Sequence, residues 1–104
     1  MKYIIVFVTA SLQKEAQKIA DSLIKSKTAA CVNIISNIES IYLWKGKKET
    51  ARECLLIAKT KQTKFNELKN IVKRLHSYKV PEIIGMPVIE GNKDYLGWIE
   101  EVLR

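Results

Sequence analysis

The sequence predicts an α+β fold in which helices pack on one face of an antiparallel sheet. Strand and helix patterns follow in the order strand, helix, strand, strand, helix, strand, with a short helix at the end. The two central strands, over residues 30–44 and 47–59, form one unusually long hairpin. Apolar residues fill both alternating positions of the first and third strands, which makes both faces of the sheet apolar. This order of elements is that of the ferredoxin-like, or split βαβ, fold.

The first strand and the first helix begin the chain. Residues 3–9 are apolar or β-branched, as in a strand that is buried on both faces. Ser11 is a candidate cap for the helix that follows, which is amphipathic to about Lys27. The apolar residues of this helix recur at helical spacing and are Leu12, Ala16, Ile19, Ala20, Leu23 and Ile24.

The long hairpin comes next. Residues 30–35 form its first segment, Ser36 and Asn37 interrupt the pattern, and residues 38–44 continue it. Gly46 permits a tight reversal, and residues 47–59 return as the third strand. The residues that share one face of the continuation are Ile38, Ser40, Tyr42 and Trp44.

A helix, a strand and a short helix complete the pattern. Thr63 is a candidate cap for a helix that stops by Tyr78. Pro81 is permitted at the start of a strand over residues 82–89, and Gly91 with Asn92 then turns the chain. Asp94 suits the first turn of the last helix. The apolar stripe of the first of these helices consists of Phe65, Leu68, Val72 and Leu75. The last helix has two apolar stripes, one of Tyr95, Trp98 and Val102 and the other of Leu96, Ile99 and Leu103.

The composition is that of one globular domain over residues 1–104. The net charge is +7, but the lysines are scattered along the chain, which favours a solvated surface over a nucleic-acid groove. The longest apolar stretch, residues 3–10, is far shorter than the roughly 20 residues that span a bilayer, and it reads as a strand rather than a signal peptide. Cys31 and Cys54 lack a Cys-x-x-Cys pairing and are expected to be reduced. We expect a cytoplasmic protein with no nucleic-acid or membrane partner.

The length of the hairpin predicts a homo-oligomer. At about 3.3 Å per residue each arm reaches over about 40 Å, roughly twice a typical strand. Such a hairpin overhangs its own domain, and its free edges need a partner chain. Large aromatic side chains dominate such contacts, so Tyr42, Trp44 and Trp98 are the expected interface residues. The alternative is a tip that folds back on its own subunit.

The only histidine, His76, lies just ahead of Pro81 at the boundary between a helix and a strand. Such boundaries are where ligands tend to bind, and the imidazole titrates near neutral pH. A histidine near a helix C-terminus can instead simply stabilise the helix dipole. The sequence leaves both roles open.

Five segments, in this order along the chain, resemble the CutA divalent-cation tolerance family. They are Ala-Cys-Val-Asn-Ile (30–34), Tyr-Leu-Trp-Lys-Gly-Lys (42–47), Lys-Thr (59–60), His-Ser-Tyr-Lys-Val-Pro-Glu-Ile (76–83) and Asp-Tyr-Leu-Gly-Trp (94–98). The resemblance covers the whole chain. It implies a ferredoxin-like subunit in a homotrimer similar to the PII signalling proteins. It also implies tolerance to copper or other divalent metal ions, without a required cofactor or an assigned catalytic activity.

The resemblance further implies a cleft between subunits that involves Cys31, Trp44, Glu53, His76, Tyr78 and Glu82. By donor softness His76 and Cys31 are the expected copper ligands, with Glu53 as an oxygen supplement. Some members carry a further cysteine and histidine where this chain has Val8 and Leu75. Because the remaining donors are few, a tight site would have to draw on two chains.

Three other functions compete with metal binding. A trimeric small-molecule sensor or signalling scaffold of the PII type, without a specific metal site, is the main alternative and rests on the fold alone. An acid-base pair of His76 with Glu53 or Glu82 could support catalysis, but no glycine-rich phosphate loop or nucleophile motif is present. RNA binding requires aromatic residues on the third strand, where residues 52–60 have none.

Overall fold

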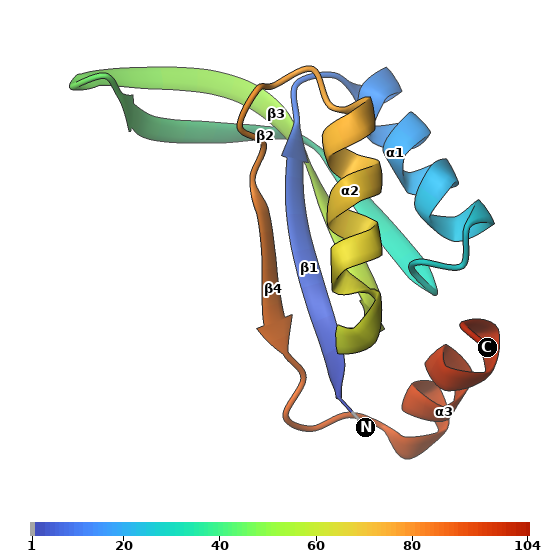
Figure 1. Ribbon diagram of the computed structural model, residues 1–104. Coiled ribbons are helices and arrows are strands. Elements are labelled where there is room, and N and C mark those ends of the chain that lie inside the picture. Colours follow the sequence, from blue (N-terminus) through green and yellow to red (C-terminus); the bar gives the residue numbers. More distant parts are fainter. Residues whose placement is uncertain (1) are drawn as a thin grey trace.

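The computed structural model describes residues 2–104 and has the predicted ferredoxin-like fold (Figure 1). The elements in order are β1 (Tyr3–Ala10), α1 (Gln13–Lys25), β2 (Cys31–Trp44), β3 (Lys47–Lys61), a 3-10 turn (Gln62–Lys64), α2 (Phe65–Leu75), β4 (Ile83–Pro87) and α3 (Lys93–Val102). The strands form one sheet in the order β2-β3-β1-β4. Every neighbouring pair in the sheet is antiparallel.

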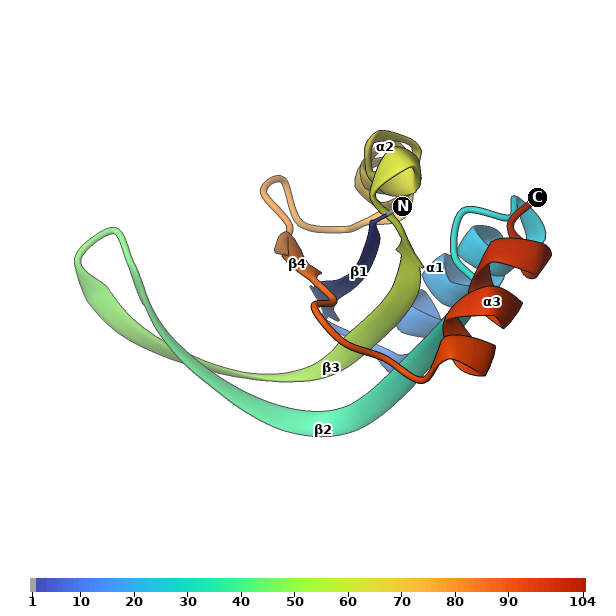
Figure 2. The same cartoon turned by 90° about the horizontal axis from the view of Figure 1, so that it is seen from below.

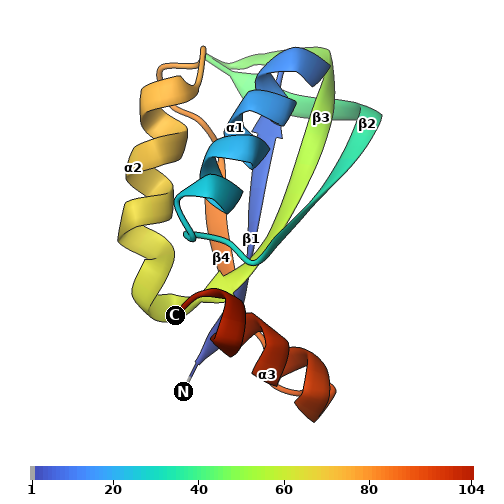
Figure 3. The same cartoon turned by 90° about the vertical axis from the view of Figure 1, so that its right-hand side faces the viewer.

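The core lies between the sheet and the two longer helices. Figure 3 shows α1 and α2 side by side on one face of the sheet. Alternate residues of β1 and β3 point to this face, while both helices turn an apolar stripe toward it. Fully buried side chains from the four elements are Val6, Val8, Ile19, Leu23, Leu56, Leu68 and Val72. In the described chain no helix is long and apolar enough to cross a bilayer.

The β2-β3 hairpin is as long as predicted and extends beyond the rest of the molecule (Figure 1). It pairs from Cys31 opposite Lys59 to Trp44 opposite Lys47. The register shifts between Ile35 and Ile38, so the predicted interruption is a bulge within one strand. Figure 2 shows that the hairpin is strongly curved, with its concave side toward the loop that precedes β4.

The second face of the sheet is covered only in part. Ile99 of α3 and Leu103, which follows the helix, pack with Ala30 and Tyr3 at one end of the sheet. Farther along this face the edge strands leave Ile35, Ile84 and Met86 about half exposed, at 47, 53 and 50%. Within one chain, α3 therefore covers this apolar face at one end alone.

Several boundaries differ from the sequence-based prediction. Neither Ser11 nor Thr63 caps a helix, because the cap positions are Leu12 and Lys64 and neither carries a side-chain cap bond. Thr63 instead lies in the 3-10 turn. The observed cap is Asn92, whose side chain accepts a 3.0 Å hydrogen bond from the Asp94 N–H at the start of α3.

Helix α1 and strand β4 are shorter than predicted, whereas β1 and β3 are longer. Helix α1 ends at Lys25 because Lys27 has a left-handed backbone, with φ 58°. Strand β4 covers Ile83–Pro87 rather than residues 82–89, and β3 continues to Lys61 instead of ending at residue 59.

Candidate functional site

His76 is the residue at which α2 ends, and its backbone is extended, with φ −83° and ψ 141°. Five residues later Pro81 precedes β4, so the connection between them cannot continue the helix. The loop lies above the concave side of the β2-β3 hairpin (Figure 2). Its side chains can therefore form one wall of a groove whose floor is the hairpin.

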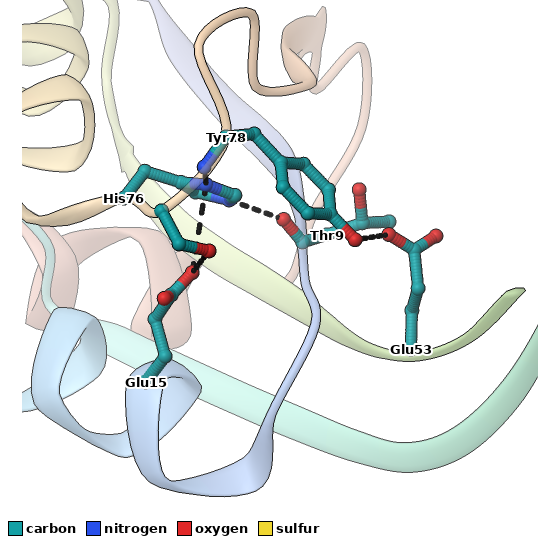
Figure 4. A network of polar contacts seen from close by, with 6 residues as sticks. Thr9, Glu15, Glu53, His76 and Tyr78 are labelled. Atoms are coloured by element: carbon teal, nitrogen blue, oxygen red, sulfur yellow. Dashed lines mark hydrogen bonds and ion pairs between the residues drawn. The ribbon is translucent and has the colours of Figure 1, made fainter. Parts of the chain in front are cut away.

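Both ring nitrogens of His76 are already in hydrogen bonds (Figure 4). Nε2 lies 2.6 Å from the carbonyl oxygen of Thr9 in β1. A carbonyl can only accept, so Nε2 carries the proton. Nδ1 accepts a 3.0 Å hydrogen bond from the Tyr78 N–H, and the imidazole side chain is 0% exposed. His76 thus ties the loop to β1 and folds the loop back on itself.

Helix α1 contributes an acidic partner to the same loop. A carboxylate oxygen of Glu15 lies 3.5 Å from Nδ1 of His76. The same oxygen accepts a 3.2 Å hydrogen bond from the Ser77 hydroxyl. Neither Glu15 nor the Thr9 carbonyl was anticipated from the sequence. Glu15 carried a faint signal as an acidic residue in a first helical turn, whereas a backbone carbonyl carries none.

Tyr78 connects the loop to the hairpin. Its hydroxyl donates a 2.7 Å hydrogen bond to the carboxylate of Glu53 in β3 (Figure 4). Burial raises the pKa of Tyr78 well above its usual value, and the hydrogen bond and the negative charge of Glu53 raise it further. The phenol therefore remains a donor at every physiological pH. Glu53 itself is only 7% exposed.

The groove between loop and hairpin has a volume of about 830 Å³. The predicted cleft residues Trp44, Glu53, Tyr78 and Glu82 all line it, so the structure brings these four together in one subunit. The other lining residues are Thr9, Ser40, Ile41, Tyr42, Glu49 and Val80.

Cys31 lies elsewhere. It begins β2 opposite Lys59, whereas Glu53 is opposite Ile38, about 20 Å farther along the strand. Its surroundings include Asn33, whose amide oxygen is 4.0 Å from the sulfur, and Tyr95 of α3. Burial raises the pKa of Tyr95, and so do the charge of Cys31 and a hydrogen bond to it. One subunit cannot bring Cys31 to His76.

The described residues 2–104 contain no group of three or more His, Cys, Asp or Glu side chains close enough to hold a metal ion. Within one chain the predicted donors thus divide into three: Glu53 in the groove, His76 behind it with both nitrogens engaged, and Cys31 on another part of the sheet. A closed metal site usually needs three or four ligands.

The predicted interface residues are exposed in the single chain. Tyr42, Trp44 and Trp98 are 45, 55 and 41% exposed. Tyr42 and Trp44 lie near the tip of the hairpin, while Trp98 stacks at a tilt on Tyr95 in α3, with ring centroids 5.5 Å apart. Because β2 and β4 are the outer strands of the sheet, each leaves one edge without a strand partner in the chain.

Comparisons with known proteins agree with this architecture. The model of the CutA1 divalent ion tolerance protein family matches residues 4–102. The divalent-cation tolerance protein CutA of Thermus thermophilus is 43% identical over 97 residues, which cover 93% of this chain and 94% of the relative. The human protein CutA is also 43% identical, over 92% of this chain, but the match spans only 54% of the human protein.

Solved structures show the same likeness. The periplasmic divalent cation tolerance protein CutA of Archaeoglobus fulgidus superposes with a TM-score of 0.95 at 41% identity, covering 98% of this chain and 99% of that one. CutA1 of Oryza sativa superposes with a TM-score of 0.96 at 42% identity, covering 100 and 95% of the two chains.

Proposed function

This chain belongs to the CutA1 divalent ion tolerance protein family, and from that membership we propose that it is a homotrimer that binds copper or other divalent metal ions at a cleft between subunits. The observation that carries the proposal is the groove in which Glu53 lies nearly buried beside Glu49 and Glu82. Carboxylate oxygens are ligands for divalent cations. We propose a binding protein rather than an enzyme.

The trimer is supported by the surfaces that a single chain leaves bare. The hairpin overhangs its own subunit, and the outer strands β2 and β4 leave edges and half-exposed apolar side chains. A ring of subunits that pair through these edges would cover Ile35, Ile84 and Met86. The aromatic residues Tyr42, Trp44 and Trp98 are the proposed anchors of the interface.

The three donors expected from the sequence do not fit a metal site equally well. Glu53 fits, because Tyr78 occupies only one of its carboxylate oxygens. His76 can bind an ion only after giving up the bond to Thr9 or to Tyr78. Cys31 can contribute only from another subunit or at a separate site. We therefore propose Glu53 as the primary ligand, His76 as its support, and oxygen donors as the main type.

The second candidate is a trimeric sensor of a small molecule, or a signalling scaffold, without a specific metal site. It is favoured by the size of the groove, since about 830 Å³ exceeds what a bare ion needs and lies within the range of small-molecule sites. We propose a cytoplasmic location, which the two free thiols Cys31 and Cys54 support. Relatives named as periplasmic and as chloroplastic show that the family occupies other compartments too.

Native mass spectrometry of reduced, metal-free protein tests the trimer and the ion site together. The protein is titrated with Cu²⁺ and, separately, with Mn²⁺, which prefers oxygen ligands. We expect a trimer that takes up one ion per subunit, with uptake lost in Glu53→Gln and kept in Glu39→Gln. Glu39 is exposed on the same hairpin and loses the same charge. Gradual ion uptake that is equal in both variants would refute the proposed metal site, and a monomeric protein would refute the proposed cleft between subunits.

A further inference from the structure

The groove beneath the loop is acidic in a basic protein. The chain has 18 lysines and arginines against 11 acidic residues. Nevertheless three carboxylates line the groove, from Glu49, Glu53 and Glu82, and none of its lining residues is a lysine, an arginine or a histidine. The surface charge of this protein would predict the opposite composition. The groove therefore has an electrostatic character of its own, which calls for a ligand of positive charge.

Strand alternation produces this separation of charge. In β3, Glu49, Ala51 and Glu53 point to one side of the hairpin, while Lys48 and Arg52 point to the other. On the paired strand Tyr42 lies opposite Glu49 and Ser40 opposite Ala51. The concave side of the hairpin thus carries Glu49, Glu53 and Tyr42, and Lys48 and Arg52 lie on the convex side. Lys47, opposite Trp44 nearer the tip, shares the side of the acids but does not line the groove.

Glu53 is the least exposed of the three carboxylates, at 7%. One of its oxygens accepts the Tyr78 hydroxyl, and in Figure 4 the other points away from that contact. Among the described residues no lysine, arginine or histidine side chain forms an ion pair with Glu53. Glu53 is therefore a nearly buried negative charge without a positive partner. Burying such a charge is costly unless it is paired.

Three aromatic side chains, Tyr42, Trp44 and Tyr78, complete the walls. Aromatic rings do not coordinate divalent metal ions, so metal binding by itself gives the ring faces no role in the groove. Ring faces do attract organic cations, by about 0.5–2 kcal/mol for each well-placed ring. Aromatic walls around a carboxylate are the usual chemistry for recognising a substituted ammonium group.

We propose that this groove binds a small organic ammonium cation, with Glu53 as its charge partner and Tyr42 and Trp44 as ring faces against its alkyl groups. An organic cation sheds water at less cost than a divalent metal ion does, and it needs no converging set of oxygen ligands. The described residues provide no such set of three donors. This inference goes beyond the proposed ion tolerance and does not depend on it.

Tetramethylammonium and tert-butyl alcohol are a suitable pair of probes, since they are similar in size and differ in charge. The intact, assembled protein is labelled with ¹⁵N, and the indole N–H resonance of Trp44 is followed by NMR during titration at constant ionic strength. The resonance is distinguished from that of Trp98 with a Trp44→Phe sample. We expect a saturable shift with tetramethylammonium and none with the alcohol.

Charge variants decide the role of Glu53. A unit charge at about 4 Å contributes at least about 1 kcal/mol, so Glu53→Gln should weaken the binding of tetramethylammonium at least about fivefold. Glu39→Gln, on the same hairpin but absent from the groove lining, should leave it unchanged. Glu49→Gln changes an exposed position and provides a second measure that does not depend on folding at a buried site.

The inference is overturned if tetramethylammonium causes no saturable shift, if the alcohol binds equally well, or if neither Glu53→Gln nor Glu49→Gln weakens binding more than Glu39→Gln. These outcomes are separable from failure of the ion site. Divalent ions taken up without tetramethylammonium binding would leave the proposed function intact and remove this inference. Tetramethylammonium bound without any divalent ion would support the inference and remove the ion site.

Discussion

Removing the imidazole of His76 should destabilise the metal-free protein. The substitution His76→Ala deletes two hydrogen bonds, to the Thr9 carbonyl and from the Tyr78 N–H, and a side chain that is 0% exposed. Each hydrogen bond contributes about 1 kcal/mol net, and each buried group left without a partner adds a penalty of similar size. We expect the free energy of unfolding to fall by about 2–4 kcal/mol per subunit.

The measurement is urea unfolding at a fixed subunit concentration in the presence of a chelator, because assembly and bound ions both shift apparent stability. His76→Asn is the matched variant. Its side-chain oxygen can take the place of Nδ1 as the acceptor for the Tyr78 N–H, while the bond to Thr9 is lost. It should therefore lose only about half as much stability as His76→Ala.

A histidine that served only as a metal ligand would behave differently. It would leave the chelated protein almost unchanged and would affect stability only when ions are added. A loss below about 0.5 kcal/mol for His76→Ala under chelation, the size of an ordinary surface change, would refute the structural role. The same result would mean that the imidazole of His76 is free to act as a metal ligand.

Three other predictions concern the tyrosines, a helix end and the interface. The pKa values of Tyr78 and Tyr95 are raised on folding, so above the ordinary value of 10.0 these side chains ionise first in the unfolded chain. The free energy of unfolding should therefore fall as the pH rises above 10.0, and Tyr78→Phe should make this fall smaller when denaturation is measured as a function of pH. Lys27 takes the left-handed position after α1, so Lys27→Gly should stabilise the protein by about 1 kcal/mol in urea unfolding. Lys25→Gly, at the last residue of the helix, should destabilise it. Trp44→Ser should weaken the proposed trimer, and native mass spectrometry that finds the trimer unaffected would remove Trp44 from the interface.

The fold could be predicted because its determinants are local and repeated. Each determinant acts over only a few residues. These determinants are the alternation of apolar residues in β1 and β3, the helical spacing of apolar residues in α1 and α2, and Gly46 at the reversal of the hairpin. The caps at Ser11 and Thr63 were wrong because a side chain that can cap helps only where the backbone places it beside free N–H groups. A 3-10 turn before α2 moved Thr63 out of that position.

Four of the residues expected at the cleft share one groove, but the contacts around them could not be anticipated. Trp44, Glu53, Tyr78 and Glu82 do line one groove. No sequence pattern could reveal that the ring of His76 bonds to the Thr9 carbonyl, since β1 and the end of α2 meet only through the tertiary fold. The separation of Cys31 from Glu53 follows from their register in the hairpin, which depends on a bulge whose presence the break at Ser36 and Asn37 only suggested.

Three side-chain contacts join the loop to three different elements. His76 ties the loop to β1, Ser77 ties it to α1 through Glu15, and Tyr78 ties it to β3 through Glu53. The first two bonds lie behind the loop, whereas the third crosses the groove. A cation that draws Glu53 away from Tyr78 would break the third bond and leave the first two in place. The loop would then keep its contacts with β1 and α1 and lose its contact with β3.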